Sequence, residues 1–295
     1  MKGKHKRWLG YCLYGVGLTL ALLYYRFPSE AVRDFLSAET GRLMPGVRVS
    51  LQGVLPSLKF GLELKGIEIA QKTGTSSPVL RVERFFVRPA VRSFVRGQSK
   101  WCFGGSLYEG AIKGCARLNG DSPGKSFAMT IYLEHVILDQ ENPLVGLAGR
   151  TVEGTLGGAI FYEGHFGSWD RGKGKADLTI TKGRVELLTP VLGLESIDFG
   201  EVRFRATLGD GKVTVSSLDL KGKQMHGTLS GEVYLNRDIM QSRLNLKGTL
   251  EPYSGFFKEL KASPKSMSLI KKQLKRGKLA FLIQGTVAEP GIRFL

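Results

Sequence analysis

Hydrophobic and polar residues alternate with a period of two through much of the chain after Val47. The alternation is most regular in segments 212–220, 225–235, 242–250 and 278–287. Successive side chains of a strand point to opposite faces, so this pattern predicts antiparallel strands with one apolar and one solvated face. The apolar face is expected to carry Leu229, Val233, Leu235, Leu244, Leu246, Leu250, Phe281 and Ile283.

The first half of the chain shows the same period less regularly. Strands are predicted at 62–69, with Gly66 as a bulge, and at 80–88, 101–107, 111–118 and 127–138. The pattern predicts a mainly β protein, built as an elongated, curled antiparallel sheet with a few short helices. Whether its apolar face closes onto a second sheet as a sandwich or stays open as a groove is left undecided by the sequence.

The N-terminal segment 8–25 is different, because it has 18 residues without a charge. A helix of that length spans about 27 Å, close to the hydrocarbon thickness of a bilayer. Four basic residues in the tip 1–7 predict a cytoplasmic N-terminus. The segment is therefore predicted to be a single transmembrane helix, with everything from Arg26 onward exported. The alternative is a cleaved signal peptide, for which Thr19-Leu20-Ala21 offers the best cleavage site.

A helix is expected next to the membrane, within residues 26–46. Ser29 can cap its start, Glu30 suits the positive end of the helix dipole, and Pro45-Gly46 ends it. A second helix is expected at 264–276, where basic residues flank an apolar stripe. It would either contact an anionic lipid surface or lie solvated at the sheet edge. Its basic residues are Lys265, Lys271, Lys272, Lys275 and Arg276.

Charge and candidate chemistry narrow the functional classes. A net charge of +17 suits an anionic membrane or an acidic partner, and no recognisable nucleic-acid-binding module is present. Cys102 and Cys115 face each other across the predicted hairpin and form either a disulfide or two buried thiols. No metal-ligand spacing, phosphate-binding loop or nucleophile–base arrangement occurs in the sequence. A non-enzymatic protein without a cofactor or a metal is expected.

The layout and four stretches of sequence resemble the AsmA-like proteins. The stretches are 209–222, 227–235, 242–252 and the ending Ile283-Gln-Gly-Thr-Val-Ala-Glu-Pro-Gly-Ile-Arg-Phe-Leu295. Length and the single N-terminal anchor are most similar to one branch, the N component of type II secretion systems (GspN). This resemblance implies a single-pass protein of the Gram-negative inner membrane, with residues 47–295 forming a periplasmic β-rich AsmA-like domain.

Two functions follow from the resemblance. The first is an accessory role in the type II protein secretion system, with other secretion-system subunits and the inner membrane as partners. The second is lipid transfer between the inner and outer membranes, in which the apolar groove binds phospholipid acyl chains. Nucleic acid is not an expected partner for an exported domain.

Overall fold

The computed structural model describes a sheet and short helices. Residues described are 8, 10, 11, 14, 15, 17–19, 22, 24–43, 47–57, 61–71, 78–94, 97–119, 126–139, 152–165, 168, 171–191, 194–236, 238–253 and 277–295. Fourteen strands form one sheet whose spatial order is the order of the chain, and every neighbouring pair is antiparallel. The prediction of a mainly β, antiparallel protein with few short helices is confirmed.

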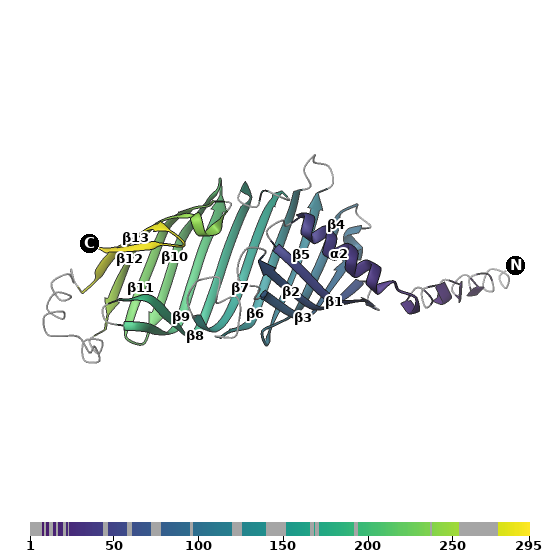
Figure 1. Ribbon diagram of the computed structural model, residues 1–295, viewed down its shortest axis with the longest axis horizontal. Coiled ribbons are helices and arrows are strands. Elements are labelled where there is room, and N and C mark those ends of the chain that lie inside the picture. The colour runs from purple at the N-terminus through teal and green to yellow at the C-terminus, as the bar shows by residue number, and fades with distance from the viewer. Residues whose placement is uncertain are drawn as a thin grey trace.

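The sheet is elongated and bent, with the N-terminal strands at one end and the C-terminal strands at the other (Figure 1). Its strands are β1 Val47–Ser57, β2 Gly61–Gln71, β3 Pro78–Pro89, β4 Ser99–Leu107, β5 Gly110–Asn119, β6 Ser126–Leu138, β7 Val152–His165, β8 Lys173–Val191, β9 Leu194–Gly209, β10 Lys212–Gly222, β11 Met225–Tyr234, β12 Arg243–Pro252, β13 Leu279–Thr286 and β14 Pro290–Phe294. Because all belong to one sheet, the described strands form no two-sheet sandwich.

Three short helices accompany the sheet in the described residues. Helix α2, Ser29–Leu43, lies against β1, and α3, Val91–Phe94, contacts β4. A 3-10 turn, Ile239–Gln241, is capped by the Asp238 side chain and precedes β12. Helix α2 begins at Ser29 within the segment predicted to be helical. Val32 and Leu36 of this helix are half-buried, whereas Phe35 is 66% exposed, so α2 only partly buries its apolar side chains.

Strand register gathers the apolar positions onto one surface, here called the apolar face. Directly opposite residues of paired strands share a face of the sheet. One such row crosses nine strands, over about 38 Å at the usual strand spacing. It consists of Ile131, Ile160, Ala176, Ala206, Val215, Gly231, Leu246, Ile283 and Ile292.

Bulges keep the apolar face continuous where the simple alternation fails. In β6, two residues separate Leu133 from Val136 instead of one, and His135 between them has a φ of 54°. Lys182 of β8, beside a register shift between β7 and β8, has a φ of 51°. Gly66 of β2 also has a positive φ, 57°, but β2 keeps one register with β1 and with β3 across this residue, so the bulge predicted there is not found. An extra residue in one strand shifts its alternation by one position. The apolar side chains therefore stay on one face although their spacing in the sequence changes.

Burial is shallow for a chain of this size. The protein exposes 20017 Å² and has a mass of 32.4 kDa, whereas a compact globular chain of that mass would expose about 12,400 Å². A small buried cluster lies around the β4–β5 turn and contains Ile67, Val82, Leu107 and Val136. Most other residues of the apolar face are only half-buried, because the sheet is a single layer.

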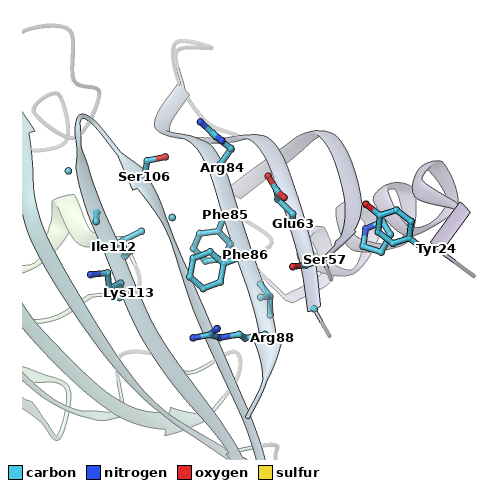
Figure 2. Close-up of a pocket in the computed structure, with 16 residues that line it drawn as sticks. Tyr24, Ser57, Glu63, Arg84, Phe85, Phe86, Arg88, Ser106, Ile112 and Lys113 are labelled. Atoms are coloured by element: carbon cyan, nitrogen blue, oxygen red, sulfur yellow. The ribbon is translucent and has the colours of Figure 1, made fainter. Parts of the chain in front are cut away.

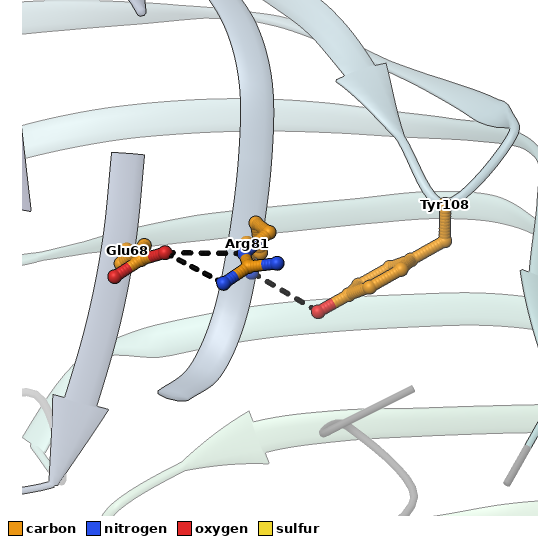
Figure 3. Close-up of polar contacts among 3 residues, drawn as sticks. All are labelled: Glu68, Arg81 and Tyr108. Atoms are coloured by element: carbon orange, nitrogen blue, oxygen red, sulfur yellow. Dashed lines mark hydrogen bonds and ion pairs between the residues drawn. The ribbon is translucent and has the colours of Figure 1, made fainter. Parts of the chain in front are cut away.

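Tyr108 holds the β4–β5 turn in place (Figure 3). Pairing of β3 with β4 begins at Arg84, so the backbone N–H of Arg81 has no partner on β4. This N–H donates instead to the Tyr108 hydroxyl at 3.0 Å, while the Arg81 guanidinium donates to Glu68. On the other side, the N–H of Ile137 donates to the Tyr108 carbonyl at 3.0 Å. Burial raises the pKa of Tyr108, which keeps the phenol protonated.

Replacing Tyr108 by Phe should lower the free energy of unfolding by about 1 kcal/mol, because a backbone donor loses its acceptor. Urea denaturation followed by circular dichroism measures this change. Tyr132→Phe is the matched control, since Tyr132 is 52% exposed. The control should change stability by less than about 0.5 kcal/mol. Equal effects in the two variants would contradict a specific role of the Tyr108 hydroxyl.

The described residues of segment 8–25 are helical and extend beyond the β1 end of the sheet (Figure 1). Their large side chains are exposed: Trp8 by 72%, Tyr11 by 74%, Tyr14 by 70% and Tyr25 by 89%. These four side chains are therefore not buried against the sheet. No helix made of described residues combines the length and the hydropathy that a membrane crossing requires.

Candidate functional site

The apolar face over β11–β13 contains nearly all the residues predicted to form it. The pairing of β11 with β12 and of β12 with β13 places these residues in adjacent rows across the three strands. The exception is Leu235, which follows the end of β11. Leu246 is buried, with 8% exposure, whereas the other strand residues of the set remain half-buried. These others are Leu229, Val233, Leu244, Leu250, Phe281 and Ile283.

Aromatic rings on the apolar face lie over glycines of the neighbouring strand. A Cβ added to Gly248 would come within 2.5 Å of the Phe281 ring, and one added to Gly183 within 2.5 Å of the Phe199 ring. Each ring thus occupies the space that a side chain at the glycine would need. Because the rings lie along the sheet rather than standing upright, the face stays low and smooth. Glycine within a strand often marks a place where another group approaches the backbone closely.

The opposite, polar face has a hollow over β1–β5 near the N-terminal segment (Figure 2). Its volume is about 720 Å³, and its lining includes Tyr24, Glu63 and Arg84. A second hollow, of about 740 Å³, continues over β3–β7 and shares Phe86, Arg88 and Lys113 with the first. Both hollows lie on the polar face, but the name polar-face hollow is used below for this second one alone. Sequence reasoning did not find it, because its residues come from five strands.

Cys102 and Cys115 lie in the polar-face hollow. Cys102 of β4 is directly opposite Cys115 of β5, and a disulfide joins them with an S–S distance of 2.08 Å. The structure therefore has the disulfide rather than two buried thiols. Tyr108 and Glu109 form the turn between the strands, with φ values of 45° and 60°. The disulfide ties β4 to β5 in the middle of the hollow and fixes the spacing of the side chains around it.

Ion pairs on the polar face join residues of neighbouring strands or of the same strand. Arg184 donates to Asp198 at 2.6 Å, and this bond lowers the pKa of the Asp198 carboxyl. Arg203, 2.6 Å from Glu201, lowers the pKa of that carboxyl, with a smaller contribution from Lys221. These groups are exposed to solvent, so each pair contributes modestly to stability.

Stability should fall as the pH drops below about 4.5, where unfolded carboxyls begin to take up protons. The folded carboxyls have lowered pKa values, so the unfolded chain binds protons first and the ion pairs are lost as the pH falls through the folded pKa. Melting temperatures measured from pH 7 to pH 3 test this. Glu201→Gln should reduce the fall in melting temperature at acid pH. Glu83→Gln changes an exposed residue without an ion pair to described residues, and should leave that fall unchanged.

The described residues contain no cluster of His, Cys, Asp and Glu that could hold a metal ion. The predicted lipid-contact residues Lys265, Lys271, Lys272, Lys275 and Arg276 lie outside the described residues.

Comparisons of the chain with family models, with curated proteins and with solved structures find no match. The candidate site therefore consists of two surfaces of one sheet, an apolar face and a basic, aromatic hollow on the polar face.

Proposed function

We propose that this protein is a non-enzymatic, membrane-anchored component of a bacterial envelope that holds phospholipid acyl chains on the apolar face of its sheet. The observation that carries the proposal is the continuous row of apolar residues across nine strands, most of them only half-buried. An acyl chain lying along this row would remove apolar surface from water, at about 25 cal/mol for each Å² buried.

The anchor belongs to the same proposal. Segment 8–25 is uncharged and follows a basic tip, and its described side chains are exposed rather than packed on the sheet. Insertion into the inner membrane, with the N-terminus in the cytoplasm, would cover these side chains. The sheet would then extend into the periplasm as a curled, AsmA-like groove, where a disulfide is stable.

Lipid analysis of the purified full chain tests the proposal. The protein is extracted from membranes in a mild neutral detergent, examined by native mass spectrometry, and its bound lipid is quantified as phosphorus per chain. We expect at least one phospholipid per chain, retained through purification. Reproducible absence of phospholipid from protein that is folded by circular dichroism would refute the proposal.

A second candidate function is an accessory subunit of the type II secretion system, as the resemblance to the N component implies. One observation favours it. Strands β1 and β14 each pair on only one side within the described residues, and an unpaired strand edge can accept a strand from another subunit. Secreted proteins of a parent strain and of a clean deletion strain should then differ, with folded exoproteins retained in the periplasm. An unchanged set in a strain that uses this system would count against the role.

A further inference from the structure

We propose that the polar-face hollow binds the phosphate diester of anionic phospholipids, so that this face of β3–β7 contacts an anionic membrane surface. The site lies on the opposite side of the sheet from the apolar face and does not depend on acyl-chain binding there. Its lining includes four basic residues, Arg88, Lys100, Lys113 and Arg117, but a single carboxylate, Glu163.

The arrangement of the cations points to an anionic ligand. Lys100 of β4 is directly opposite Arg117 of β5, a pairing of like charges that destabilises a sheet unless an anion lies between them. Arg88 is opposite Cys102, beside this pair. None of these three cations forms an ion pair with a described residue. By contrast, Lys113 is already bound to Glu134 at 2.7 Å.

Phosphate chemistry fits the unpaired cations. An arginine can donate two parallel hydrogen bonds to a phosphate, and a nearby lysine adds a compact charge. Arg88 is directly opposite Cys102 of the disulfide, and Lys100 and Arg117 lie two positions along β4 and β5 from Cys102 and Cys115. Because the disulfide ties β4 to β5, the cations are already positioned before a ligand binds.

Aromatic side chains favour a membrane surface over a soluble anion. Phe86 is 39% exposed, Phe161 41% and Tyr132 52%, although they lie on the polar face. The Arg88 guanidinium lies 5.6 Å from the centroid of the Phe86 ring. Aromatic rings interspersed with Arg and Lys are the composition of protein surfaces that lie in the headgroup layer.

The location of the hollow agrees with such contact. The adjoining hollow shares Phe86, Arg88 and Lys113 with it and is also lined by Tyr24, at the end of the apolar N-terminal segment (Figure 2). The basic face and the proposed anchor therefore lie at the same end of the molecule (Figure 1). A protein held by segment 8–25 would keep this face within reach of the lipid headgroups.

Binding of short-chain lipids to the full chain in neutral detergent micelles tests the inference. Microscale thermophoresis is used to compare dioctanoyl phosphatidylglycerol, dioctanoyl phosphatidylcholine and inorganic phosphate. At low salt the anionic lipid should bind at least about tenfold more tightly than the zwitterionic lipid, and added salt should reduce this preference. Lys100→Glu/Arg117→Glu should abolish the preference. Arg205→Glu/Lys247→Glu, with the same change of charge at exposed residues away from the hollow, should keep it.

Each outcome decides the proposal. Equal affinity for the two lipids, or equal loss of preference in the two double variants, would overturn it. Inorganic phosphate binding as tightly as the anionic lipid would assign the hollow to a free anion instead. If the Glu variant does not fold, Lys100→Gln/Arg117→Gln replaces it. Affinity for the zwitterionic lipid reports separately on acyl-chain binding, so failure of this inference is distinguishable from failure of the proposed function.

Discussion

Replacing Leu229 or Ile283 by Asp should reduce the phospholipid bound to the purified protein at least about tenfold, equivalent to 1.4 kcal/mol, while the sheet remains folded. Both side chains are half-buried on the apolar face, so a carboxylate there can keep contact with water. The same carboxylate would lie against the acyl chain and make its binding unfavourable. Phosphorus per chain measures the lipid, and circular dichroism measures the fold.

Two variants on neighbouring positions complete this test. Ser230→Asp adds the same charge next to Leu229 but on the polar face, opposite Lys247, and should keep the lipid. Leu246→Asp should unfold the protein, because Leu246 is only 8% exposed and a buried, unpaired carboxylate is costly. If Leu229→Asp unfolds the chain as Leu246→Asp does, the apolar face is a closed core and the lipid proposal is wrong.

Gly231→Val should lower the free energy of unfolding by about 3 kcal/mol or more, from backbone strain and overpacking together. Gly231 has a φ of 138°, which favours glycine, and an added Cβ would meet the Asn245 carbonyl oxygen and approach the Leu246 Cα within 2.9 Å. Both contacts are with the backbone of β12, which cannot move without breaking the ladder. Thermal unfolding and denaturant titration measure the loss.

Gly209→Val is the matched control for this substitution. Gly209 ends β9, its φ is not in the positive region, and an added Cβ would meet nothing within 4 Å. Stability should therefore change by less than about 0.5 kcal/mol. A comparable loss at both positions would mean that valine is disfavoured in these strands in general, and that the close approach at Gly231 has no special role.

Within the described residues, the single layer of the sheet leaves its apolar face without a second layer of protein over most of its length. A compact protein covers its apolar side chains with a second layer. Here the described α-helices α2 and α3 contact β1 and β4, and from β6 onward the described residues include the 3-10 turn Ile239–Gln241 but no α-helix. In the proposed function the missing layer is supplied by lipid, whose chains bind one face while the basic hollow on the other contacts headgroups.

The sequence alone predicted the regular strands and part of the site. Strands β11–β13 follow the period of two closely, and the alternation places Leu229, Leu246 and Ile283 on the apolar face. Strand β10 departs from this period at a register shift between Val215 and Leu218. The hairpin predicted from strands 101–107 and 111–118 is also present, with Tyr108 and Glu109 as its turn. Such features depend on residues close together in the chain, so the pattern of side chains carries the information directly.

Strands β7, β8 and β9 were missed for the opposite reason. Their alternation changes phase at bulges, as between Ile180 and Gly183, where two residues separate members of the same face. A fixed period of two then fails, although Ile160, Ile180 and Val202 still lie on the apolar face. Only the register with neighbouring strands shows where the phase changes.

What the sequence determined by itself is the β class, the direction of most side chains and the uncharged N-terminal segment. The tertiary structure decided that all described strands join one sheet, and that Arg88, Lys100 and Arg117 surround one disulfide. These residues are up to 29 positions apart in the sequence. The alternation along one strand predicts the face of the sheet on which a side chain lies. Its neighbours on that face depend on strand register, which turns, bulges and packing across strands determine.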